Sequence, residues 1–376
     1  YYFDLMVLKK KQKRLVFFLP NFILGGAGES IFKLSKFLNK HNFSILIISL
    51  GKNLYKKEFR KNNCEIIEMD SSRAFFSIFK LRKLIINESK KNFEKIIFIS
   101  NLNYVNIISV ISLINLNKIK VILTERSSIS ELKYSDNLIN KLKNKLIYFF
   151  AKILYKFSDL IITNSKFEKN YIKNKFQLKN VICIHPPSIK SIKRKNSKNK
   201  YKKILNIIYV GRLSKEKGIF IILKALKNLN KKYKFLFNLY GDGPERKSIK
   251  EFIKINNLNK IISLKGFVQD KKLIFKNSDL FINASLWEGL PNALVQSINY
   301  NVFPICSDAP GGNIEVIKNG KLGISFKTND EKDLQKKITK FMIKRLKLNN
   351  KIRIQHLKDY TELKSNHKYL KTLNKL

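Results

Sequence analysis

The chain has 376 residues and a mass of 44.1 kDa, a length that suits two domains with a hydrophobic core each. Hydrophobic residues make up 44% and aromatic residues 12% of the sequence, which excludes a disordered or fibrous protein. The formal net charge is +49, so nucleic acid, anionic lipid and phosphorylated substrates are all candidate binding partners.

The positive charge is spread along the whole chain. Residues 1–188 carry 34 basic and 13 acidic side chains (+21), and residues 189–376 carry 42 and 14 (+28). A nucleic-acid-binding module would gather its charge in one stripe with aromatic platforms, so nucleic acid is a disfavoured partner. Distributed charge can still hold a protein at an anionic membrane, because each Lys or Arg near the surface contributes about 1 kcal/mol.

The cysteines and the apolar segments indicate a chain without a disulfide framework or a membrane span. Cys64, Cys183 and Cys306 are too few and too scattered for disulfides or zinc, which is typical of a reducing compartment. No apolar run approaches the roughly 18 residues that a membrane helix needs. The basic residues 9–14 and the apolar run after them imitate a signal peptide, but Pro20 interrupts that run, so a first strand is expected there. Because the sequence starts at Tyr1 rather than Met, the natural chain is expected to begin earlier.

Short β-branched and aromatic runs alternate with amphipathic stretches from end to end, the pattern of βαβ units with parallel sheets. In the first half, strands are expected at residues 14–19, 44–50, 64–68, 95–100, 119–124, 159–163 and 180–184. A second series is expected at residues 204–210, 234–240, 261–264, 279–283, 302–306 and 323–326. The pattern therefore predicts an α/β protein with two doubly wound parallel-sheet domains.

Composition predicts the domain boundaries. Residues 1–189 are expected to form the N-terminal domain and residues 204–350 the C-terminal domain. Residues 190–203 hold eight basic groups with little to bury, so they are predicted to be a solvated linker. Residues 351–376 are helical in pattern and are expected to cap the second domain and pack back on the first. Doubly wound sheets bind ligands at the carboxyl ends of their strands, so the site is expected in a cleft between two such edges.

Polar residues follow three strands of the second domain. Arg212 and Lys217 come directly after the strand at 204–210, and a guanidinium and an ammonium group there suit phosphate. Glu288 follows the strand at 279–283, just before a helix that begins near Pro291, and can accept hydrogen bonds from sugar hydroxyls. A simple helix-capping role for Glu288 remains an alternative. After the strand at 302–306, a glycine pair precedes Glu315 in the first turn of a helix.

Five segments in this order and spacing resemble the C-terminal nucleotide-sugar domain of glycosyltransferase family 4. They are GRLSKEKG, YGDGPER, KGFVQD, NASLWEGLPNALVQS and SDAPGGNIEVI. The resemblance is strong over residues 205–326, and looser in the first half through TERSS, ITNS and IHPPS segments and a glycine pair after the first strand. It implies the GT-B fold, in which two Rossmann-like domains face each other across a cleft, and a retaining mechanism. On this resemblance, residues 1–189 would be the acceptor-side domain and residues 204–350 the nucleotide-sugar-binding domain.

The resemblance also implies roles for particular residues. Arg212 and Lys217 would bind the donor diphosphate and, with Glu288, form the catalytic set. The donor-binding residues would be Gly25, Gly26, Phe267, Val268, Gly289, Leu290, Pro291, Asn292 and Gln296. Gln296 stands where the family has a second glutamate for the ribose, so it lacks the charge-assisted part of that hydrogen bond. We expect Gln296→Glu to keep or raise activity.

Glu125 and Arg126 are candidates for the acceptor side, with a buried structural pair as the alternative. Many family members carry a histidine after the fourth strand, where this chain has Asn101 and Asn103, so no general base is expected there. The family lets the departing phosphate take the acceptor proton, and no metal or other cofactor is expected. His185, before two prolines, is interpreted as part of a hinge rather than a ligand.

The sequence thus predicts a retaining hexosyltransferase that moves a sugar from a nucleotide-diphosphate donor, UDP-sugar in first place, to a lipid-linked or surface-polysaccharide acceptor. Such an enzyme would serve bacterial surface-glycan synthesis, lipopolysaccharide included, and lie in the cytoplasm, peripheral on the cytosolic face of the inner membrane. A GDP-mannose-dependent mannosyltransferase and a catalytically weak scaffold are the alternatives. Residues 138–157 are basic and rich in aromatics, which suits a helix on a membrane surface or, as we favour, one packed on the sheet.

Overall fold

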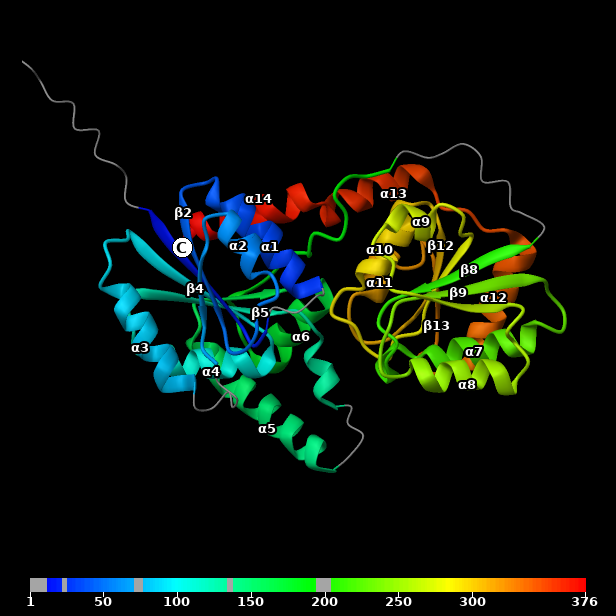
Figure 1. The fold of residues 1–376 in the computed structure, drawn as a ribbon, viewed down its shortest axis with the longest axis horizontal. Coiled ribbons are helices and arrows are strands. Elements are labelled where there is room, and N and C mark those ends of the chain that lie inside the picture. The colour runs from blue at the N-terminus through cyan, green and yellow to red at the C-terminus, as the bar shows by residue number, and fades with distance from the viewer. Residues whose placement is uncertain (1–11, 22–25, 71–76, 134–137, 194–203) are drawn as a thin grey trace, which may run out of the picture. The chain divides into compact units, whose positions relative to one another are not determined.

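A computed structural model of the chain describes residues 12–21, 26–70, 77–133, 138–193 and 204–376 (Figure 1). The chain divides into two compact units, and each unit is built from segments that are separated in the sequence. Unit 1 takes Tyr1–Thr163, Tyr171–Cys183 and Asn366–Leu376, and unit 2 takes Asn164–Asn170 and Ile184–Ser365.

Unit 1 is built on a seven-stranded, fully parallel sheet in the order β3-β2-β1-β4-β5-β6-β7. Its strands are β1 (Lys13–Leu19), β2 (Phe43–Ser49), β3 (Glu65–Glu68), β4 (Lys95–Asn101), β5 (Ile119–Glu125), β6 (Leu160–Thr163) and β7 (Val181–Cys183). The inner strands are buried along nearly their whole length, as expected where helices cover both faces of a parallel sheet.

Helices cover both faces of this sheet (Figure 1). One face carries α1 (Gly26–Asn39) and α2 (Lys56–Lys61), and the other carries α3 (Ser77–Ser89), α4 (Asn103–Leu113) and α5 (Leu138–Leu154). Helix α6 (Lys166–Phe176) lies between β6 and β7 in the chain. The last helix, α14 (Glu362–Lys375), adds to the first face, where His367 meets Phe37 of α1 edge-on with ring centroids 5.4 Å apart.

Unit 2 repeats the plan with a six-stranded parallel sheet in the order β10-β9-β8-β11-β12-β13. Its strands are β8 (Leu205–Val210), β9 (Phe235–Tyr240), β10 (Ile262–Gly266), β11 (Leu280–Asn283), β12 (Phe303–Ser307) and β13 (Ile324–Phe326). Each of these strands, in both units, lies within two residues of its predicted position. The predicted fold class is therefore confirmed.

The helices of unit 2 also form two layers (Figure 1). A first layer packs on one core and consists of α7 (Ile219–Leu229), α8 (Arg246–Ile255) and α12 (Glu331–Lys344). The second layer packs on the opposite core and consists of α9 (Lys271–Phe275), α10 (Asn292–Asn299), α11 (Asn313–Val316) and α13 (Asn350–Leu357). In the part of the chain that the structure describes, no helix is long and apolar enough to cross a membrane.

Both sheets change the direction of their strand order next to the first strand, between β1 and β4 in unit 1 and between β8 and β11 in unit 2. The loops after the two strands on either side of such a switch point diverge to opposite faces and leave a crevice, where doubly wound sheets bind ligands. In unit 2 this point lies between the strands that precede Arg212 and Glu288.

Unit 2 begins before the predicted start of the C-terminal domain. Ile189 pairs with Thr361 in a short parallel bridge. The fully buried Arg353 of α13 donates hydrogen bonds to the carbonyl oxygens of Lys193 and Asn299, each at 2.9 Å. The first residues of the predicted linker are thus held on unit 2, while residues 194–203 lie outside the described part of the chain.

Candidate active site

An ion pair occupies the switch point of unit 2. Lys217 Nζ donates to Glu288 Oε1 at 2.8 Å, and the hydroxyl of Ser285 donates to the same oxygen at 2.7 Å. The side chains of Lys217 and Glu288 are 23% and 13% exposed, so solvent reaches both. The structure thus brings together two of the three residues of the predicted catalytic set.

Gly218 lets the segment that carries Lys217 lie against the end of β11. Its φ is +60°, and a Cβ on this residue would lie 2.1 Å from the carbonyl oxygen of Ala284. Next to it, the backbone N–H of Leu286 donates to the carbonyl oxygen of Glu216 at 2.8 Å. Only glycine fits this approach, which sets Lys217 beside the loop of Glu288.

The glycine pair before α11 holds the Glu288 loop from the other side. The backbone N–H of Glu288 donates to the carbonyl oxygen of Pro310 at 3.0 Å, and that of Gly312 donates to Gly289 at 3.1 Å. Gly311 has a φ of +126°, and a Cβ there would lie 1.7 Å from the carbonyl oxygen of Glu288. These glycines therefore permit a close approach of the protein's own backbone.

Arg212 follows β8 and is exposed. The Tyr209 hydroxyl holds the loop that carries Arg212, because it donates to the carbonyl oxygen of Arg212 at 2.7 Å. Burial, together with the carboxylates of Glu288 and Glu216, holds the pKa of Tyr209 well above its ordinary value. The hydroxyl therefore stays protonated at neutral pH and keeps donating to this loop.

Two of the predicted donor-binding residues hold the segment after β7. Asn292, the first residue of α10, accepts a hydrogen bond from the Ser188 hydroxyl at 2.7 Å. Gln296 Nε2 donates to the carbonyl oxygen of Ser188 at 3.1 Å. Both side chains remain partly exposed, so the ribose contact implied for Gln296 stays a prediction.

The contact with Ser188 gives Gln296→Glu two separable effects. A carboxylate cannot donate to the Ser188 carbonyl, so we expect the free energy of unfolding to fall by about 1–2 kcal/mol. A carboxylate accepts ribose hydroxyls more strongly, so the KM for the donor is expected to stay equal or fall. Thermal melting measures the change in stability, and initial rates at increasing donor concentration measure KM and kcat. A loss of activity of more than tenfold would contradict the placement of Gln296, and Gln296→Met is the control that removes both functions.

The remaining residues predicted to bind the donor differ in their exposure to solvent. Gly289, Leu290 and Pro291 are buried at the start of α10. Phe267 follows β10 and is 76% exposed, while Val268 beside it is half-buried against the second core of unit 2. Gly26 begins α1, and Gly25 lies outside the described residues.

Glu125 and Arg126 stand at the end of β5 in unit 1. Glu125 is fully buried, where the Asn106 amide donates to its Oε1 at 2.9 Å and the Tyr155 hydroxyl donates to the same atom. Arg126 Nε donates to Asn101 Oδ1 at 2.8 Å, and burial lowers the pKa of its guanidinium. These contacts hold both side chains within unit 1, and the acceptor-side role of Glu125 and Arg126 stays a prediction.

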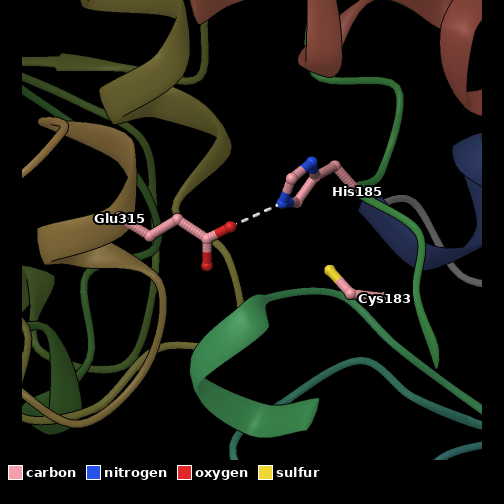
Figure 2. A group of neighbouring side chains, drawn as sticks. All are labelled: Cys183, His185 and Glu315. Atoms are coloured by element: carbon pink, nitrogen blue, oxygen red, sulfur yellow. Dashed lines mark hydrogen bonds and ion pairs between the residues drawn. The ribbon is translucent and has the colours of Figure 1, made fainter. Parts of the chain in front are cut away.

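One pair of unit 2 could not be predicted from the sequence. His185 Nε2 and Glu315 Oε1 lie 2.7 Å apart, and Glu315 Oε2 accepts the backbone N–H of Lys166 at 2.7 Å (Figure 2). The His185 ring also stacks on Tyr360, with centroids 4.6 Å apart. Because 130 positions separate His185 from Glu315, only the histidine before two prolines and the acidic first turn of α11 signalled them. Figure 2 also draws Cys183, the last residue of β7. The expectation that the protein needs no metal stays a prediction.

Comparison with known proteins finds glycosyltransferases. Residues 188–358 match the profile of the family described as glycosyl transferases group 1. An uncharacterized glycosyltransferase, MJ1059 of Methanocaldococcus jannaschii, is 29% identical over 54% of this chain and 51% of its own length, so the chain spans about half of that relative.

A relative from Campylobacter jejuni matches over most of its length. It is 26% identical over 86% of this chain and 88% of its own, and is named GalNAc-alpha-(1->4)-GalNAc-alpha-(1->3)-diNAcBac-PP-undecaprenol alpha-1,4-N-acetyl-D-galactosaminyltransferase. The structure of Anabaena Alr3699/HepE, solved with UDP and glucose, superposes with a TM-score of 0.74 at 15% identity and covers 96% of this chain and 99% of that one. Two doubly wound units, the motif-bearing switch point and these matches together identify residues 188–358 as a glycosyl transferases group 1 domain, in a chain with the GT-B fold.

Proposed function

We propose that this glycosyltransferase is a retaining enzyme that moves a sugar from a nucleotide-diphosphate donor, in the first place a UDP-sugar, to a lipid-linked or surface-polysaccharide glycan. The observation that carries the proposal is the Lys217–Glu288 ion pair at the carboxyl ends of β8 and β11, in the loops that also carry the solvent-accessible Arg212. Cations at this point suit a diphosphate, and a carboxylate beside them suits sugar hydroxyls.

In the proposed reaction, Arg212 and Lys217 contact the oxygens of the donor diphosphate, and Glu288 accepts a hydrogen bond from the donor sugar. The bond between the anomeric carbon and the diphosphate oxygen breaks, and the acceptor oxygen bonds to that carbon on the same face. The acceptor proton passes to the departing phosphate oxygen. The two cations stabilise the charge that grows on that phosphate, which is where fixed charges lower a barrier most. The proposal includes no metal and no protein base.

The acceptor and the location are supported by the relatives and by the charge. The Campylobacter jejuni protein is named for a glycan on undecaprenol diphosphate, an acceptor that lies in a membrane. A chain with a net charge of +49 is attracted to an anionic membrane surface. In this proposal the enzyme therefore works at the cytosolic face of the membrane, bound from one side.

A thermal-shift panel tests the donor. We expect a nucleoside diphosphate of one base, UDP, to raise the melting temperature by several degrees, since a ligand at about 100 times its Kd adds about 2.7 kcal/mol. GDP, ADP and the UMP control are expected to shift it less. A larger shift with GDP would favour the mannosyltransferase alternative, and no shift with any nucleotide would favour the scaffold.

A further inference from the structure

Helix α5 has two apolar faces, and only one of them packs on the protein. Ile147, Tyr148 and Leu154 join the core of unit 1, together with the buried Ala151. The packing on the sheet that the sequence favours is therefore confirmed. The opposite side of the helix is exposed and also apolar, comprising Leu138, Ile139, Leu142, Leu146, Phe149, Phe150 and Ile153.

These exposed residues form one continuous stripe, which we call the outer stripe of α5. Residues 139, 142, 146, 149, 150 and 153 recur every three or four positions, so they share one side of the helix. Leu142 is 62% and Phe149 is 55% exposed. An apolar stripe of this length on a protein surface marks an interaction site.

Lysines border the outer stripe on both sides. Lys141, Lys145 and Lys152 fall on one edge of it and Lys143 on the other, by the roughly 100° turn per residue of an α-helix, and all four are exposed. Within the 17 residues of α5 there is no Asp or Glu. An apolar stripe between rows of lysines matches the boundary between the acyl chains and the anionic headgroups of a bilayer.

We propose that α5 lies flat on an anionic lipid surface, with the outer stripe among the acyl chains and its lysines among the headgroups. The charge argues for lipid rather than for a second copy of the chain, because pairing two such helices would bring their lysines together. This inference deepens the proposed function and rests on it, since it names the surface that brings the enzyme to a membrane-held acceptor.

Vesicle flotation tests the proposal. The wild-type protein is expected to float with vesicles that contain anionic phosphatidylglycerol, and at least tenfold less with vesicles of phosphatidylcholine alone. The variant Leu142→Glu/Leu146→Glu/Phe149→Glu is expected to lose at least tenfold of the binding to anionic vesicles. The matched control is Ile255→Glu/Ile343→Glu/Leu363→Glu, which changes three exposed apolar residues of unit 2 and the net charge by the same amount. It is expected to float like the wild type.

The other outcomes overturn the proposal. They are wild-type protein that stays in solution, equal binding to both kinds of vesicle, or equal loss in the control. A wild-type dimer in lipid-free solution that the α5 variant converts to a monomer would assign the stripe to a second copy. Melting temperature and its rise with UDP are measured on each variant and are expected to match the wild type. If the protein floats with anionic vesicles but does not bind UDP, only the proposed function is contradicted. If it binds UDP but does not float, only this inference is contradicted.

Discussion

Arg212→Ala is expected to lower kcat/KM by about 30- to 1,000-fold, which corresponds to about 2–4 kcal/mol of transition-state stabilisation. Arg212 is exposed, so the loss of its side chain should leave the melting temperature within about a degree or two of the wild type. The backbone carbonyl of Arg212, which the substitution keeps, is the group that accepts the hydrogen bond from Tyr209. The effect therefore reports on the ligand. Steady-state kinetics with the donor found in the thermal-shift panel measure it.

Two further variants make this result specific. Arg212→Lys keeps the charge but loses the planar fork that binds two phosphate oxygens, so a partial recovery is expected. Arg246→Ala removes a second arginine of unit 2, at the start of α8, and is expected to keep at least half of the wild-type activity. Wild-type turnover in Arg212→Ala would remove Arg212 from the catalytic set.

Gly311→Ala is expected to lower the free energy of unfolding strongly and to abolish donor binding with it. At a φ of +126° a side chain is strained by about 1–3 kcal/mol, and the added Cβ would lie 1.7 Å from the carbonyl oxygen of Glu288. To relieve this contact the loop that carries Glu288 must move, since both segments meet through their backbones. Differential scanning calorimetry and nucleotide titration measure the two losses.

Gly320→Ala is the matched control for the effect of strain alone. Gly320 also has a positive φ, +87°, but nothing lies within 4 Å of the position of its Cβ. We expect this variant to lose stability by the strain only and to keep its donor affinity. If Gly311→Ala and Gly320→Ala destabilise equally and both bind donor, the contact between the two loops does not hold Glu288 in place.

The architecture could be predicted because parallel strands covered by helices are encoded as continuous apolar runs. Residues 96–99 of β4, for example, are all apolar, so the strand is easily recognised in the sequence. Helices such as α7 are recognised by their amphipathic period. The proximity of Lys217 and Glu288 was also predictable, since both follow strands whose carboxyl ends meet at one edge of a sheet.

The features that the sequence does not reveal depend on contacts across long separations. The burial of Glu125 depends on Asn106 and Tyr155, which come from two other helical segments. The use of Gln296 and Asn292 to hold Ser188 needs a register between α10 and a segment 104 or more positions earlier. The sequence also does not reveal what the glycines before α11 approach. A glycine pair after a strand is compatible with a loop around a ligand, but here the pair lies against the backbone of Glu288 and Gly289.

The affinity that the second phosphate of the donor nucleotide contributes tests the role of Arg212 and Lys217 most directly. Isothermal titration with the nucleoside diphosphate and with its monophosphate measures this difference in the wild type and in Arg212→Ala/Lys217→Ala. We expect the diphosphate to bind the wild type at least about tenfold more tightly than the monophosphate, and the double variant to bind both alike. An advantage of the diphosphate that persists in full without these two side chains would contradict the claim that they hold the pyrophosphate.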